Sequence, residues 1–112
     1  MNNPAAPART PAPPYYAVIF TSQRTDGDRG YDAMAARMVE LGSSYDGFLG
    51  IDSVRGADGL GITVSYWRDE ASIQAWKRDT EHEKAQDAGK KSWYEHYEVR
   101  IAKVERAYGK PA

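Results

Sequence analysis

Short blocks of hydrophobic and polar residues along the chain predict alternating strands and helices. Residues 15–22, YYAVIFTS, are mostly apolar, aromatic or β-branched without strict alternation, which is typical of a strand covered on both faces. Between residues 31 and 41, apolar side chains recur at steps of three and four and predict a helix with one apolar face. Gly42 is expected to end this helix as its C′ residue.

The middle of the chain predicts a β-hairpin. Residues 46–56 read as a second strand, and the turn residues at 57–59 lead into a third strand at 60–67. Side chains alternate across a strand, so the third strand has an apolar face and a polar-lined face that ends in a tryptophan. The apolar face carries Ile62, Val64 and Tyr66, and the face that could line a cavity carries Thr63, Ser65 and Trp67.

The pattern after residue 67 predicts two short helices and a long strand. Acidic residues open a first helix, and Asp79-Thr80 offers a break where Thr80 and Glu83 form a T-x-x-E capping box for a second. Residues 93–109 then alternate, which predicts a half-buried strand. Its apolar positions are Tyr97, Val99 and Ile101, and its polar ones are His96, Glu98 and Arg100.

The resulting β-α-β-β-α-β order predicts an α+β, ferredoxin-like antiparallel sheet with its helices on one face. We expect this domain to span residues 15–108, between a tail at 1–14 and a short one at 109–112. The first tail holds five of the six prolines, which disfavour helices and central strands. It reads either as a disordered leader or as an extended arm lying on a partner subunit.

Composition narrows the classes of function. Fifteen basic and sixteen acidic residues give a net charge of -1, and without a concentrated basic patch we expect no nucleic-acid partner. The chain has no cysteine, which excludes disulfides and thiolate metal sites and suits the cytoplasm. It also has no run of eighteen apolar residues, so we expect no membrane span.

Candidate chemistry gathers between residues 62 and 98, which hold all three tryptophans and both histidines. Trp67 and Trp76 either hold a planar substrate or fill the gap between helix and sheet. His82 is a candidate general base, because the unperturbed pKa of a histidine side chain, about 6.5, suits proton transfer near neutral pH. It could instead ligate iron or lie on the surface.

These residues together resemble the antibiotic biosynthesis monooxygenase (ABM) domain family over roughly residues 15–108. The resemblance rests on Tyr66-Trp67, Ala75-Trp76, His82 with Ala85-Gln86, Trp93-Tyr94 and Asp46-Gly47-Phe48. It implies a dimeric α+β barrel, in which two sheets pack face to face and each subunit keeps a pocket between its sheet and helices. A sheet with helices on one face only also favours a homodimer, since its other face needs a cover.

The family includes enzymes that oxidise polycyclic phenols without metal or flavin and enzymes that degrade haem. This chain departs from both patterns. Thr63 stands where the phenol-oxidising kind has an asparagine, and Gln86 stands where the haem-degrading kind has an iron-ligating histidine. The asparagine of the haem-degrading kind also has no counterpart near residues 20–22.

The resemblance therefore implies a cofactor-independent and metal-free monooxygenase for a small aromatic or quinone-like molecule. Trp67 and Trp76 would hold the plane of the substrate, and His82 would take its phenolic proton. The expected pocket residues are Trp67, Thr63, Ser65, Gln86 and Tyr94. The alternatives are a non-catalytic module that binds a hydrophobic metabolite and, third, a haem-degrading monooxygenase.

Overall fold

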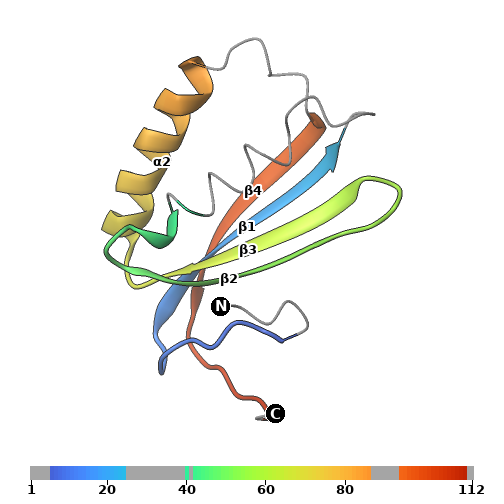
Figure 1. The fold of residues 1–112 in the computed structure, drawn as a ribbon. Coiled ribbons are helices and arrows are strands. Elements are labelled where there is room, and N and C mark those ends of the chain that lie inside the picture. The colour runs from blue at the N-terminus through green and yellow to red at the C-terminus, as the bar shows by residue number, and fades with distance from the viewer. Residues whose placement is uncertain (1–5, 25–39, 41, 87–93, 111–112) are drawn as a thin grey trace.

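A computed structural model describes residues 6–24, 40, 42–86 and 94–110. Four antiparallel strands form one sheet in the order β2-β3-β1-β4, and helix α2 lies on one side of it (Figure 1). This confirms the predicted ferredoxin-like α+β fold, although the helix predicted over residues 31–41 falls almost wholly outside the described residues. The elements are β1 (Tyr15–Arg24), β2 (Phe48–Arg55), β3 (Leu60–Trp67), α2 (Glu70–Gln86) and β4 (Tyr94–Val104).

The strand register assigns every residue to one of two faces. Val18 on β1 lies opposite Ser65 on β3 and Ile101 on β4, and residues opposite each other in an antiparallel pair point to the same face. We call this the helix-side face, because it packs against α2. The other, here called the outward face, carries Tyr15, Ala17 and Ile19 of β1.

The hydrophobic core lies between the helix-side face and the first turns of α2. Val18, Trp67 and Ile73 are buried together, and Trp67 has no exposed surface. A tryptophan side chain buries about 150–250 Å², which at about 25 cal/mol per Å² stabilises the fold by roughly 4–6 kcal/mol as an upper bound. The partly buried residues packed around this centre are Tyr16, Tyr45, Phe48 and Trp76.

Helix α2 is continuous from Glu70 to Gln86, so the predicted break at Asp79-Thr80 is wrong. The segment contains neither glycine nor proline, and aspartate and threonine each cost a helix interior only about 0.7 kcal/mol. Asp79 also accepts a hydrogen bond from the hydroxyl of Tyr45. The helix start is instead marked by Asp69, whose Oδ1 accepts the Ser72 backbone amide at 2.8 Å as an N-cap does.

Gly42 also differs from its predicted role as a C′ residue. Residues 42 and 43 are still helical, and Gly42 is not among the positive-φ glycines of the described chain, which are Gly47, Gly50 and Gly59. A Cβ on Gly42 would lie 3.2 Å from Nε1 of Trp76. The missing side chain therefore serves close packing against an indole ring.

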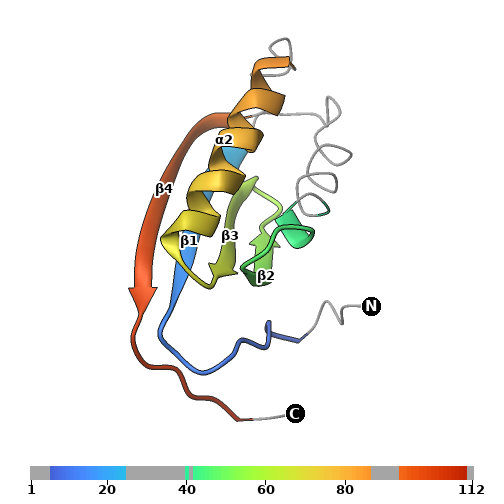
Figure 2. The ribbon, with the colours of Figure 1, turned by 90° about the vertical axis from the view of Figure 1, so that its left-hand side faces the viewer.

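Strand β4 is less covered than its alternation predicted. Tyr97, Val99 and Ile101 point to the helix-side face, yet each is about half exposed, at 52%, 49% and 47%. These side chains are exposed because β4 is an edge strand and α2 does not cover it. The helix packs instead through Ile73 and Trp76 onto Trp67 of β3. The view in Figure 2 shows β4 at the edge of the sheet, beside α2 and not beneath it.

Candidate functional site

Two tryptophans on different elements form the centre of the helix-side face. The ring centroids of Trp67 on β3 and Trp76 on α2 lie 5.4 Å apart with the planes tilted by 41°. Phe48 contacts the other side of Trp67 edge-on at 5.3 Å, and Gly42 lies against Trp76. Trp76 keeps some exposed surface and Trp67 has none, so Trp67 supports the ring that a ligand could reach.

The hydroxyl groups of Thr63 and Ser65 lie on this face, as the alternation of β3 predicted. Their hydrogen bonds go to neighbouring side chains. Trp67 Nε1 donates to Ser65 Oγ at 2.9 Å, and the hydroxyls of Thr63 and Ser53 lie 2.7 Å apart. The row thus fixes the tryptophan ring and ties β3 to β2.

An apolar surface extends the site toward β4, and sequence reasoning did not include it. The rings of Phe20 and Tyr97 lie 5.4 Å apart across β1 and β4. Val99 lies opposite Phe20 on the same face. The signal is the alternation over residues 97–101, which predicts a half-buried strand with its apolar side chains covered. We call Phe20, Tyr97, Val99 and Ile101 the apolar strip.

Arg55 bounds the far end of the helix-side face. Its Nη2 donates to the buried hydroxyl of Ser22 at 2.8 Å, and Nη1 donates to the carbonyls of Ser22 and Gly59. A Cβ on Gly61 would lie 2.7 Å from Cζ of Arg55. The guanidinium therefore packs directly against the backbone of Gly61, where a side chain would not fit. This arginine joins the β2–β3 turn to the end of β1.

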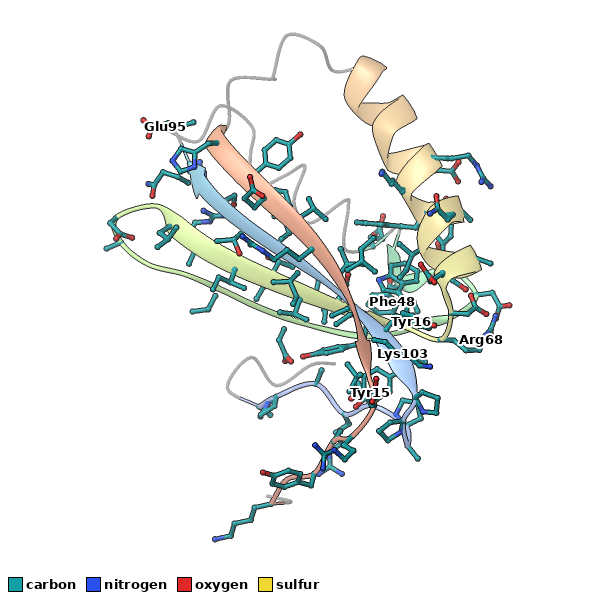
Figure 3. All side chains as sticks on the ribbon, turned by 180° about the vertical axis from the view of Figure 1, so that it is seen from behind. Tyr15, Tyr16, Phe48, Arg68, Glu95 and Lys103 are labelled. Carbon is teal, nitrogen blue, oxygen red and sulfur yellow. The ribbon has the colours of Figure 1, made fainter. Side chains whose placement is uncertain are left out.

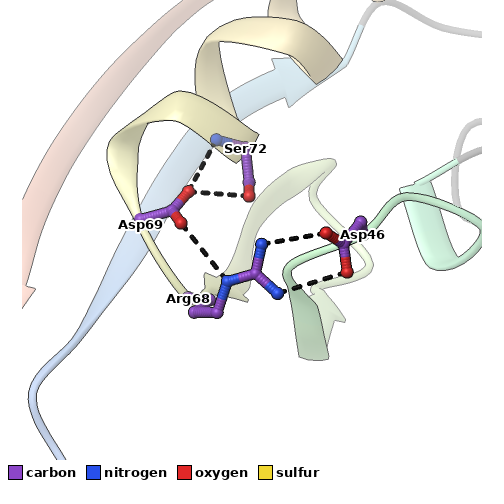
Figure 4. A network of polar contacts seen from close by, with 4 residues as sticks. All are labelled: Asp46, Arg68, Asp69 and Ser72. Carbon is purple, nitrogen blue, oxygen red and sulfur yellow. Dashed lines mark hydrogen bonds and ion pairs between the residues drawn. The ribbon is translucent and has the colours of Figure 1, made fainter.

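A charged network joins the turn before β2 to the start of α2 (Figure 4). Arg68 donates two hydrogen bonds to Asp46, at 3.2 and 3.0 Å, and one to Asp69 at 3.2 Å. The hydrogen bonds from Arg68 lower the pKa of Asp46. Hydrogen bonds from Ser72, followed by that from Arg68, lower the pKa of Asp69. The carboxylates in turn raise the pKa of Arg68.

The roles of all the predicted site residues stay predictions, and for three of them the side chain itself is not described. Positions 82 and 86 belong to α2 and Tyr94 begins β4, but the side chains of His82, Gln86 and Tyr94 lie outside the described residues. Their assigned roles stay predictions. Within the described ranges, no three His, Cys, Asp or Glu residues are grouped as a metal site would require.

Comparison with known proteins gives the family. Residues 14–88 match the family described as antibiotic biosynthesis monooxygenase. The chain is also 54% identical over 99 residues to the uncharacterized protein YqjZ of Bacillus subtilis, covering 88% of this chain and 87% of that protein. The protein belongs to the antibiotic biosynthesis monooxygenase family.

A further relative and a solved structure of the same fold carry descriptive names. The jasmonate monooxygenase ABM of Pyricularia oryzae is 32% identical over 95 residues, which cover 80% of this chain but only 43% of that protein. SnoaB of Streptomyces nogalater, a cofactor-independent oxygenase, superposes with a TM-score of 0.68 at 12% identity, covering 88% of this chain and all of that one. The latter likeness concerns the fold alone.

No helix in the described part of the chain is both long and apolar enough to cross a membrane.

Proposed function

We propose that this protein is an ABM-type monooxygenase that oxidises a small aromatic or quinone-like substrate with dioxygen, without metal or flavin. The observation that carries the proposal is the partly exposed Trp76, in tilted ring contact with the buried Trp67, together with the exposed apolar strip on the helix-side face of the sheet. A planar molecule can lie along such a surface, because aromatic rings stack offset or edge to face at centroid separations of about 4.5–7 Å. The names of two similar proteins, a cofactor-independent oxygenase and a jasmonate monooxygenase, agree with this class.

The proposed chemistry needs only a base and an apolar surface. His82 removes a proton from an anthrone-like phenol, and the resulting carbanion-enolate gives its electrons to dioxygen. One oxygen atom is bonded to the ring carbon and the other leaves as water, while the CH₂ group becomes a carbonyl. The substrate supplies all the electrons, so no external reductant is consumed. The protein contributes orientation and proton transfer, which account for large parts of such barriers.

Trp67 and Trp76 have different parts in this proposal. Trp76 contacts the substrate, and Trp67 holds Trp76 from behind, since Trp67 is fully buried. The hydrogen bond of Thr63 to Ser53 ties β3 to β2, and that of Ser65 to Trp67 fixes the indole ring. Gln86 and Tyr94 are proposed to line the remaining sides.

A homodimer is part of the same proposal. On the outward face Val54, Leu60 and Ile62 are 71%, 48% and 43% exposed, although all three are large apolar residues. β4 carries Glu98 and Arg100 on that face, so a second copy related by a two-fold axis can set each charge against its opposite. Covering the apolar residues would favour association through burial of nonpolar surface.

The test is oxygen uptake with a panel of anthrones and hydroquinones. The proposal predicts uptake above the spontaneous rate, reduced at least about tenfold by Trp76→Phe and by His82→Ala. Both variants must first give the circular dichroism spectrum of the wild type. Unchanged uptake in the two folded variants would refute the assigned roles.

A non-catalytic binding module is the second candidate, and one observation favours it. The hydroxyls of Thr63 and Ser65 already hydrogen-bond to Ser53 and Trp67. This candidate predicts quenching of tryptophan fluorescence by aromatic ligands with no oxygen consumption. Turnover of any ligand in the panel would remove it.

A further inference from the structure

Residues 6–14, here called the arm, lie against the outward face of the sheet. In Figure 1 the arm runs from the start of β1 on the side opposite α2. The backbone amide of Ala8 donates to Oδ1 of Asp52 on β2 at 2.7 Å. Thr10 Oγ1 donates to the hydroxyl of Tyr15 at 2.8 Å. Hydrogen bonds from Ala8 and Thr10 therefore hold the middle of the arm to β2 and to the start of β1.

Asp52 joins the arm to the sheet with both carboxylate oxygens. While Oδ1 accepts from Ala8, Oδ2 accepts from the hydroxyl of Tyr66 at 2.8 Å. Gly50 lies under the same contact, since a Cβ there would be 3.3 Å from Cβ of Ala8. Hydrogen bonds to a charged acceptor are roughly twice as strong as neutral ones, which makes Asp52 the anchor of the arm.

The arm lies at the end of the outward face where aromatic side chains gather. Tyr15 and Tyr66 meet edge-on at 6.0 Å. Tyr15 is 95% buried although it points away from α2, and Figure 3 places it near the arm, on the other side of the sheet from Tyr16. At the opposite end of the same face, Val54, Leu60 and Ile62 are exposed. The outward face thus has one covered end and one open end.

The arm and a second sheet cannot occupy the same end of this face. Two sheets that pack face to face lie about 10 Å apart, and their side chains fill that gap. An additional chain segment has no room in it. We propose that the arm, latched by Asp52, closes the Tyr15–Tyr66 end of the outward face to a second copy of this chain and confines self-association to the open hairpin end. This inference rests on the homodimer proposed above.

The latch is tested by tryptic cleavage after Arg9, which lies in the arm and is exposed. Asp52→Ala removes both acceptors, and we expect cleavage about ten- to a hundredfold faster, because proteolysis follows the population of the released arm. Tyr66→Phe keeps the Ala8–Asp52 hydrogen bond and should give a smaller increase. Glu105→Ala, a carboxylate outside the sheet, is the matched control. Equal cleavage in Asp52→Ala and the control would overturn the latch.

The exclusion of a second copy is tested by sedimentation equilibrium. A chain lacking residues 1–10 and the full-length Asp52→Ala variant should associate about tenfold or more tightly than the wild type, since the freed tyrosines add buried apolar area. Ile62→Glu, at the open end, should weaken association. If Ile62→Glu dissociates the protein but removal of the arm leaves association unchanged or weaker, the inference about the arm is wrong and the homodimer stands. No effect of Ile62→Glu overturns the homodimer as well.

Discussion

The indole N–H of Trp67 donates a hydrogen bond of 2.9 Å to the hydroxyl of Ser65, two residues earlier on the same face of β3. Both groups are buried. The bond satisfies the polar atom of a side chain that is otherwise surrounded by Val18, Ile73 and Phe48. It fixes the ring that Trp76 contacts, and so links the sheet to the proposed substrate surface.

Ser65→Ala should destabilise the protein by about 1–3 kcal/mol, because it leaves the Trp67 N–H buried without an acceptor. Urea denaturation followed by tryptophan fluorescence measures this change. Ser53→Ala removes a hydroxyl at an exposed position and should stay within about 0.5 kcal/mol. A Ser65→Ala protein as stable as the Ser53→Ala protein would show that the hydrogen bond contributes nothing.

Gly47→Ala should cost more than about 2 kcal/mol of stability. Gly47 has φ of 94°, and an added Cβ would lie 2.1 Å from Oγ of Ser72 at the start of α2. Gly109→Ala is the control, since nothing lies within 4 Å of its added Cβ. Thermal unfolding compares the two variants. If Gly47→Ala left the unfolding temperature unchanged, the turn before β2 would not be held tightly against the start of α2.

Acid should weaken the junction between α2 and the turn before β2. Asp46 and Asp69 have pKa values lowered from the ordinary 3.8, so their stabilising contribution is present above that value. It is lost as the pH falls through the lower pKa of the folded state. Arg68→Gln should reduce this loss, as seen in urea midpoints measured from pH of about 5 down to pH of about 3. An unchanged pH dependence would contradict the network.

Alkali should release the contact of Tyr66 with Asp52. Burial, followed by the hydrogen bond to Asp52, raises the pKa of Tyr66 from 10 to about 12. The contribution of the neutral phenol is therefore complete below pH 10 and is lost as the pH rises through about 12. Titration of tyrosinate absorbance should show one late phase that is absent in Tyr66→Phe. An identical titration curve for both proteins would refute it.

The strands and their faces could be predicted because side-chain alternation is local. Thr63, Ser65 and Trp67 lie on the helix-side face, as period two requires. The extent of α2 could not be predicted from local signals. Asp79 and Thr80 are good caps in isolation, but helical bonding continues through them, and the contact of Tyr45 with Asp79 comes from a residue 34 positions away.

The exposure of β4, the role of Gly42 and the place of the arm depend on tertiary contacts, which local sequence patterns do not contain. Val99 and Ile101 have the spacing of packed residues, yet they are exposed because β4 lies at the sheet edge. Gly42 has the sequence position of a helix end, but the nearby indole of Trp76 accounts for its missing side chain. The contact of Ala8 with Asp52 spans 44 residues, so no local pattern could place the arm.

The central claim is that the substrate lies on Trp76 and on the apolar strip of the same sheet face. Oxygen uptake with an anthrone tests this claim most directly in Val99 variants. Val99→Lys places a charge on the strip at an exposed position, and Val99→Leu keeps the surface apolar. The account predicts wild-type uptake above the spontaneous rate, retained within about twofold by Val99→Leu and lowered at least about tenfold by folded Val99→Lys. Equal uptake by Val99→Lys and the wild type would contradict it.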